Sequence, residues 1–339
     1  MSLSDGTGPG THDVMVGHGE ALATFEAAFR SGKLHHGWLI TGPEGVGKAT
    51  LAFRLARFLL SGGAGRVLDH TFDDSTARKI AGEAHPNLLV LERGLDASGT
   101  RRKTELTVDV IRKLNGFFGT TAGEGGWRVA IVDSADEMNA SAANALLKNL
   151  EEPPDRTILL LVSHRPGRLL PTIRSRCRVL PLKPLALQEV ENVLSMLPDL
   201  MASPSDIAQV ASLSGGAPGR AVALVEGAGL ELATTLHNVL AQNVPDWSAL
   251  HPLAASFQTR DAELKFQLLI SIWRDETAKA MRREVKAGNL RQAHQLTHFA
   301  ARFDQSIDET LGLNLDKRQF LLNAFDDWYR TQLSAVACA

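Results

Sequence analysis

Cysteine is scarce in this chain of 339 residues, which holds only Cys177 and Cys338. Two cysteines cannot form a four-thiolate zinc site or a framework of disulfides, and such scarcity is typical of proteins in a reducing compartment. Long apolar runs are missing too: none approaches the roughly 18 residues of a membrane-spanning helix, and the first residues lack the basic start and apolar core of a signal peptide. We therefore expect a cytoplasmic protein.

An excess of charge of one sign is also absent. The chain has 36 lysines and arginines against 38 aspartates and glutamates, which gives a formal net charge of −2. This balance excludes the chain-wide attraction by which strongly basic proteins bind nucleic acids. Any contact with DNA must therefore be local or depend on partner proteins.

What the sequence does contain is a regular alternation of short apolar runs and helical patterns over its first half. The unbroken apolar runs, which predict strands buried on both faces, cover residues 37–41, 87–91, 127–133 and 157–163. The helical patterns between them cover residues 48–60, 107–118 and 141–152. Strands and helices in alternation predict an α/β fold with a parallel sheet.

Beyond this α/β part the strand signal disappears. Short helical patterns interrupted at the glycine-rich residues 215–219 fill residues 185–228, and long amphipathic helices follow over residues 229–339. Residues 1–12, rich in glycine, serine and threonine, predict a flexible tail. With residues 13–184 as the α/β part, the sequence predicts three domains after the tail, a number that the chain length allows.

The segment GPEGVGKAT, residues 42–50, has the pattern of a phosphate-binding loop. Such a loop follows a strand and opens a helix, and its backbone N–H groups and helix N-terminus face a phosphate. The positions that predict contact with a nucleotide are Gly42, Gly45, Gly47 and Lys48. Lys48 would reach the outer phosphates; the alternative is a residual lysine on a solvent-facing loop.

The groups that bind Mg²⁺ and activate water are incomplete. The serine or threonine expected after the lysine is Ala49, and Thr50, although a candidate contact, is rotated by roughly 100° about the helix axis. Asp133, where a strand is predicted to end, is the expected metal-binding carboxylate, but the next residue is Ser134. A serine hydroxyl is too weak a base to activate water at neutral pH. We expect weak nucleotide binding and negligible hydrolysis at this degenerate site.

Two further groups of charged residues need an interpretation. Asp136 and Glu137 precede the helix predicted from residue 141, where the helix dipole favours acidic side chains. Five arginines crowd into residues 165–182, and Arg176 in the motif SRC stands apart from the others. A solvated basic face is the simplest interpretation of Arg165, Arg168, Arg174 and Arg178.

Three motifs together carry a resemblance to a known family. They are GPEGVGK from residue 42, VDSADEMNASAANALLKNLEEPP from residue 132 and LLPTIRSRC from residue 169. Their order and spacing resemble those of bacterial clamp-loader subunits of the AAA+ class, and of the delta-prime type most closely. The resemblance implies a RecA-like AAA+ domain, a helical lid, and a helical collar that joins a hetero-pentameric ring. It also implies that Arg176 serves in trans as an arginine finger for a neighbouring subunit.

The resemblance further implies a DNA replication protein, a component of the DNA polymerase III holoenzyme with no polymerase active site of its own. Its partners would be the delta subunit, the tau or gamma ATPase subunits, the sliding clamp indirectly, and primed DNA through the complex. It would act as a stator that requires no cofactor and holds ATP or ADP weakly at most. The alternative is a tau- or gamma-type ATPase motor. Ala49, Ser134 and Gly219, which stands where the motors carry a lid arginine, argue against it.

Many such subunits carry a four-cysteine zinc module after the helix that follows the loop. The corresponding residues 61–86 contain no cysteine, so we expect no zinc and no other metal. His70 and His85 in this segment are interpreted as surface polar groups.

Overall fold

The structure is a computed structural model that forms two compact units. One unit comprises Met1–Asp199 with Gly216–Gly219, and the other comprises Leu200–Gly215 with Arg220–Ala339. The structure describes residues 15–63, 65, 67, 75–82, 84–94, 103, 105–119, 126–197, 200–226, 229–242, 244–257, 262–313 and 315–336. The predicted tail, residues 1–12, lies outside these ranges, and the division into three domains stays a prediction.

The first unit is built on a parallel sheet of five strands in the order β2-β3-β4-β1-β5. The strands are β1 (Gly37–Thr41), β2 (Leu88–Leu91), β3 (Arg128–Val132), β4 (Thr157–Ser163) and β5 (Arg178–Pro181). Every residue of β1, β3 and β4 is buried, which explains why these strands appear in the sequence as unbroken apolar runs. The four predicted strands and the predicted α/β fold with a parallel sheet are confirmed.

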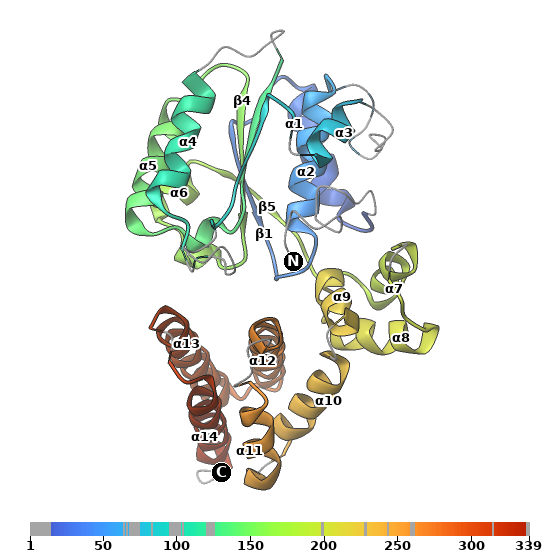
Figure 1. Cartoon of the computed structure of the whole chain (residues 1–339), viewed down its shortest axis with the longest axis vertical. Coiled ribbons are helices and arrows are strands. Elements are labelled where there is room, and N and C mark those ends of the chain that lie inside the picture. The colour runs from blue at the N-terminus through green and yellow to red at the C-terminus, as the bar shows by residue number, and fades with distance from the viewer. Residues whose placement is uncertain are drawn as a thin grey trace. The chain divides into compact units, whose positions relative to one another are not determined.

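Helices cover both faces of this sheet (Figure 1). On one face lie α1 (Gly19–Arg30), α2 (Lys48–Leu60) and α3 (Ser75–Ala81), and on the other lie α4 (Val108–Gly119), α5 (Ala140–Glu151) and α6 (Pro171–Ser175). Two 3-10 turns, η3 (Ala135–Glu137) and η4 (Pro166–Arg168), follow β3 and β4. The predicted helices over 48–60, 107–118 and 141–152 are confirmed to within one residue at each end.

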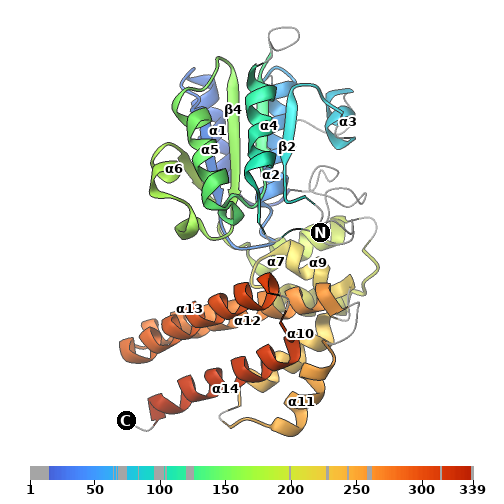
Figure 2. The ribbon, with the colours of Figure 1, turned by 60° about the vertical axis from the view of Figure 1, so that its left-hand side comes forward.

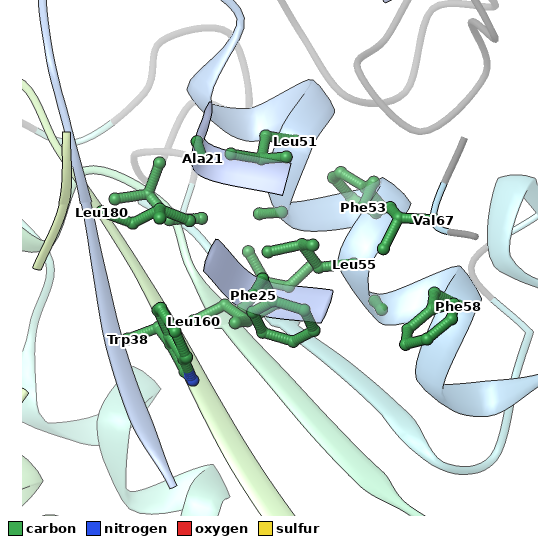
Figure 3. Close-up of a cluster of buried hydrophobic side chains, with 14 of the residues drawn as sticks. Ala21, Phe25, Trp38, Leu51, Phe53, Leu55, Phe58, Val67, Leu160 and Leu180 are labelled. Atoms are coloured by element: carbon green, nitrogen blue, oxygen red, sulfur yellow. The ribbon is translucent and has the colours of Figure 1, made fainter. Parts of the chain in front are cut away.

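Large aromatic rings anchor α1 and α2 to the sheet (Figure 3). The ring of Trp38 in β1 is fully buried and lies 5.0 Å from that of Phe25 in α1, centroid to centroid. Phe58 in α2 packs edge-on against Phe29, with the ring centroids 4.9 Å apart. Because each such ring removes roughly 150–250 Å² from water, these contacts hold α1 and α2 against this face of the sheet.

The remaining helices lie mostly in the second unit, and the last three are the longest that the structure describes. They are α7 (Leu187–Met196), α8 (Pro204–Leu213), α9 (Pro218–Glu226), α10 (Gly229–Leu240), α11 (Trp247–Ala255), α12 (Ala262–Lys286), α13 (Leu290–Gly312) and α14 (Lys317–Val336). Helices α12 and α13 run side by side (Figure 2). Trp273 of α12 stacks on Phe325 of α14, with the rings 4.4 Å apart, and is fully buried, as expected for the apolar face of an amphipathic helix. No helix among the described residues is long and apolar enough to cross a membrane.

Candidate functional site

The glycine-rich loop connects the end of β1 to the start of α2. Its backbone has φ angles of 148° at Gly42, 76° at Gly45 and 102° at Gly47, which caps α2. A Cβ on Gly42 would lie 2.5 Å from the carbonyl oxygen of Leu182, so this position has no room for a side chain. The strand, glycine loop and helix are therefore arranged as predicted, while phosphate binding stays a prediction.

Lys48 in this loop is buried and bonded to the loop itself. Its Nζ donates to the carbonyl oxygens of Gly42, at 2.8 Å, and Pro43, at 2.6 Å, and the residue is 3% exposed. Burial lowers the pKa of Lys48 to about 8, although nearby carboxylates, Glu44 first among them, act in the opposite direction. Lys48 is therefore not solvent-facing, while its contact with a phosphate or its lack of a function stays untested. A phosphate would have to compete with the two carbonyls for this ammonium.

The neighbouring positions do not complete a metal site. Ala49 and Thr50 lie half-buried in the first turn of α2. Asp133 follows β3, where its backbone N–H donates to Leu91 at 2.9 Å, and its carboxylate is close enough to favour the charged form of Lys48. Because Ala49 offers no oxygen, the donor set here fits Mg²⁺ poorly.

Ser134, which occupies the position expected for a base, has a strained backbone. Its φ of 56° lies in the left-handed region, and its Oγ is 3.4 Å from Nε2 of His164. Burial lowers the pKa of His164, and the charge of Lys48 acts in the same direction. The partner of this hydroxyl is thus an imidazole that holds a proton less tightly than an ordinary histidine, and the hydroxyl itself is too weak a base to take a proton from water at neutral pH.

Asp136 has a different role from the one predicted. Its buried carboxylate accepts hydrogen bonds from the backbone N–H groups of His164, at 2.9 Å, and Arg165, at 3.1 Å, which follow β4. Burial alone would raise the pKa of Asp136, but His164 and these hydrogen bonds lower it below its usual range. The cap of α5 is instead Asn139, whose side chain accepts from the N–H of Ala142. Asp136 therefore fixes the start of the arginine-rich segment rather than a helix end.

Glu137 is also placed differently from the prediction. Its carboxylate lies 2.9 Å from Nε of Arg93, on the segment after β2. Burial raises the pKa of Glu137 to about 7 despite the opposing charge of Arg93. Sequence spacing could not reveal the contacts of Asp136 or Glu137, because their partners belong to the segments that follow β4 and β2.

Gly219 at the start of α9 touches the glycine loop. Its N–H donates to the carbonyl oxygen of Gly45 at 2.8 Å, and a Cβ on Gly219 would lie 3.1 Å from the Cα of Gly45. The adjacent Arg220 is 6% exposed, pairs with Asp275 and donates to Oγ of Ser271 at 3.0 Å. Its guanidinium is therefore already engaged within the second unit and does not replace the missing lid arginine.

Arg176 caps the end of α6 and keeps part of its guanidinium in solvent. Nη2 lies 2.9 Å from Oε1 of Glu151, Nη1 donates to the carbonyl oxygen of Thr172 at 3.1 Å, and the side chain is 38% exposed. These contacts occupy two of the five N–H groups of a guanidinium and leave three for another partner. They also hold the fork in one orientation, because the two anchors come from different helices.

Arg176 and the glycine loop lie at opposite ends of the strands. Arg176 lies where the parallel strands begin, and the loop lies where they end. Arg176 comes just before β5, and its carbonyl oxygen would be 3.2 Å from a Cβ on Gly37, the first residue of β1. The loop instead follows the last residue of β1. Since β1 and β5 are parallel, with Trp38 opposite Arg178, the whole length of a strand separates Arg176 from the loop of its own chain.

The other arginines of this segment do not form one solvated face. Arg165 is half-buried and lies 3.7 Å from Asp136, so the prediction is wrong for this residue. Arg178 is exposed but its guanidinium lies over the ring of Trp38, 5.1 Å from the centroid. Arg168 and Arg174 are exposed as predicted.

Cysteine and histidine do not form a metal site among the residues that the structure describes. Burial raises the pKa of Cys177 to about 12, which keeps it a thiol. His85 is half-buried rather than fully at the surface, and His70 lies outside the described residues. No group of three or more potential metal ligands occurs within the described ranges.

Comparisons with known proteins agree with these motifs. The family described as "DNA polymerase III, delta subunit" matches residues 17–186. A DNA polymerase III subunit delta' from Pseudomonas aeruginosa is 39% identical over 191 residues, which cover 54% of this chain and 53% of that protein. The subunit delta' of Escherichia coli is 34% identical over 230 residues, covering 66% of this chain and 65% of that protein.

A tau subunit also matches, at lower sequence identity. The DNA polymerase III subunit tau of Escherichia coli is 28% identical over 186 residues, which cover 55% of this chain and 27% of that protein. The matched region spans about half to just under two thirds of the two delta' relatives. With the family match over residues 17–186, the chain belongs to the delta-prime family of DNA polymerase III subunits.

Proposed function

We propose that this chain is the non-motor subunit of a clamp loader, which supplies Arg176 to the nucleotide site of an adjacent ATPase subunit. Its partners are the delta subunit and the tau or gamma subunits of a hetero-pentameric ring. The ring loads the sliding clamp onto primed DNA. The observation that carries the proposal is the position of Arg176, because a half-exposed guanidinium at the sheet edge remote from its own loop can serve only another chain.

The state of the chain's own loop supports the same assignment. Lys48 is bonded to two loop carbonyls, Ala49 supplies no metal ligand, and Ser134 supplies no base. We expect ATP or ADP to bind weakly here and not to be hydrolysed. The tau- or gamma-type motor remains the competing function, and it requires turnover from this loop.

An arginine suits the proposed role for a physical reason. A guanidinium is planar and permanently charged, and it can donate two parallel hydrogen bonds to phosphate oxygens. Where an arginine finger stabilises the charge that develops in phosphoryl transfer, it accelerates the reaction by about 10³–10⁵-fold. Glu151 and Thr172 hold the fork of Arg176 without using all of its donors.

The proposal is tested by Arg176→Ala in a reconstituted clamp loader whose other ATPase sites are inactivated, so that only the site adjoining this chain turns over. We expect DNA-stimulated ATP turnover to fall by at least about 10³-fold while assembly is unchanged. Arg174→Ala is the matched control, because Arg174 is exposed on the same short helix. Equal turnover in the two variants would remove the finger assignment.

A further inference from the structure

One face of α12 carries a row of four cations that the sequence analysis did not single out. Lys279, Arg282, Arg283 and Lys286 line an open hollow of about 370 Å³. Because successive helical residues are rotated by about 100°, positions i, i+3, i+4 and i+7 fall within an arc of about 100°. We call these four residues the α12 cation row.

The row lies on the face of α12 that is turned away from the helical core. Trp273, Thr277 and Ala280, which lie on the other side of the same helix, are 0%, 2% and 7% exposed. Arg282 and Lys286 are exposed, and Lys279 is half-buried. The row is therefore a surface feature with its methylene stems along the helix and its charges in solvent.

Acidic neighbours neutralise only half of the row. Glu276 lies 2.8 Å from Nζ of Lys279, and Glu284 lies 3.3 Å from Nε of Arg283. Among the described residues, Arg282 and Lys286 have no ion-pair partner. The row thus keeps two uncompensated charges in a chain whose overall charge is −2.

The dimensions of the row match a phosphodiester backbone. Seven helical steps at about 1.5 Å each span roughly 10 Å, and a nucleic-acid strand carries one charge per about 3.4 Å, so about three phosphates face the row. Arginine forks can bind phosphate oxygens bidentately, and backbone contacts of this kind need no apolar anchor.

An acidic protein segment fits the row less well than a nucleic acid does. Protein partners usually need a buried apolar or aromatic anchor at the centre of the contact. All four residues that line the hollow are basic. The exposed Val285 lies at the flank of the row, about 60° round the helix from Arg282, and it is neither buried nor aromatic.

We propose that the α12 cation row is a binding site for the phosphate backbone of DNA, separate from the glycine loop and from Arg176. The contact is independent of sequence, because phosphates carry no base identity. The contact is local, as any DNA contact of a chain with this balanced charge must be unless partners supply it. This inference does not depend on the arginine-finger proposal.

The test measures binding of a labelled single-stranded DNA oligonucleotide to the full chain by fluorescence anisotropy. Between about 50 and 200 mM salt, we expect the affinity of the wild-type chain to fall with a log–log slope of about −1.4 to −2.8, the range for two to four phosphate contacts. Arg282→Glu with Lys286→Glu should weaken binding at least about 10-fold at the lower salt and reduce the slope by about 1.4.

The matched control is Lys33→Glu with Lys113→Glu, which makes the same change in net charge at exposed positions of the first unit. It should leave the slope unchanged. Arg282→Gln with Lys286→Gln removes the two charges without adding acids. If the charge-reversal variant does not fold, this variant should still weaken binding and reduce the slope. Equal effects of the row and control variants would overturn the proposal, as would the absence of binding even at the lowest salt.

Competition distinguishes the two kinds of polyanion. Unlabelled duplex DNA should displace the oligonucleotide at a lower concentration of charge than polyglutamate does, because a duplex carries one charge per about 1.7 Å of its axis and an extended polyglutamate only one per about 3.3 Å. Stronger displacement by polyglutamate would identify an acidic protein as the occupant and would contradict a DNA site.

Discussion

The glycine loop and the segment that ends at Arg176 are attached to adjacent strands, yet they use their cations in opposite ways. Lys48 is 3% exposed and donates to carbonyl oxygens of its own loop. Arg176 is 38% exposed and is held by Glu151 and Thr172 with three N–H groups left over. One cation is directed inward and one outward, which is the arrangement that the proposed role at a neighbour's site requires.

The two regions also differ in what supports them. The loop is held by backbone contacts, including the one between Gly219 and Gly45, and these need glycine at both ends. The arginine segment is held at its start by the buried Asp136 and at its end by an exposed ion pair. Substitutions at four positions test the two regions one contact at a time. In order of decreasing expected effect, the positions are Asp136, Gly219, Lys48 and Glu151.

Asp136→Asn should have the largest effect, because an amide offers one acceptor oxygen where the carboxylate accepts two N–H bonds. We expect the free energy of unfolding to fall by about 2–4 kcal/mol at pH 7, measured by urea denaturation. Asp109→Asn is the control and should change it by less than about 0.5 kcal/mol, since Asp109 is 82% exposed.

The same variant should change the response to acid. The pKa of Asp136 is lowered in the fold from 3.8, so its contribution is present above that pH and is lost as the pH falls through the folded value. In Asp136→Asn this part of the acid dependence should disappear. A wild-type pH profile in the variant would show that the carboxylate does not anchor the segment.

Gly219→Ala should disturb the loop alone. Its new Cβ would lie 3.1 Å from Cα and 3.2 Å from the carbonyl oxygen of Gly45, both backbone atoms that cannot easily move. We expect a loss of about 1–2 kcal/mol in urea denaturation. Gly116→Ala in α4 meets no atom within 4 Å and should instead stabilise the chain by about 0.5–1 kcal/mol. A loss in both variants would mean that the contact with Gly45 is not the cause.

Lys48→Met should change how the free energy of unfolding depends on pH, because the substitution removes the buried charge of Lys48. The pKa of Lys48 is lowered to about 8, so the folded state binds its proton less tightly than the unfolded state and stability rises with pH. Between pH 7 and 9 the wild-type chain should gain on the order of 1 kcal/mol relative to Lys48→Met. Parallel profiles in the two proteins would contradict a buried, desolvated lysine.

Glu151→Gln should have the smallest effect on stability, below about 0.5 kcal/mol, because both partners of the pair with Arg176 are substantially exposed. In the reconstituted complex it should still lower the kcat of the neighbouring site by about 3- to 10-fold, with little change in KM, because the arginine is oriented less well. Glu152→Gln, at the next and exposed position, is the control. A change in KM alone would argue that Glu151 does not position the finger.

The parts that sequence could predict are those set by local pattern. The strands at 37–41 and 157–163 are buried on both faces, so their apolar runs are unbroken. No unbroken apolar run marks the edge strand β5, because three of its four residues are exposed and it ends in proline. The glycine loop was recognised because its glycines and lysine are adjacent in the chain.

The parts that sequence could not predict depend on distant partners. Asp136 was assigned to a helix end because its true partners, His164 and Arg165, belong to the segment after another strand. The burial of Lys48 follows from packing at the edge of the sheet rather than from the loop pattern. The pairing of Glu151 with Arg176 joins the ends of two helices, and no spacing rule connects them.

The central claim is that the outward cation matters for catalysis and the inward one does not. Its most direct test is ATP turnover at the adjoining site of the reconstituted complex, compared between Lys48→Met and Arg176→Ala. We predict that Lys48→Met retains wild-type turnover within about twofold, while Arg176→Ala loses at least about 10³-fold. Loss of turnover in Lys48→Met with retention in Arg176→Ala would contradict the account and identify the chain as a motor.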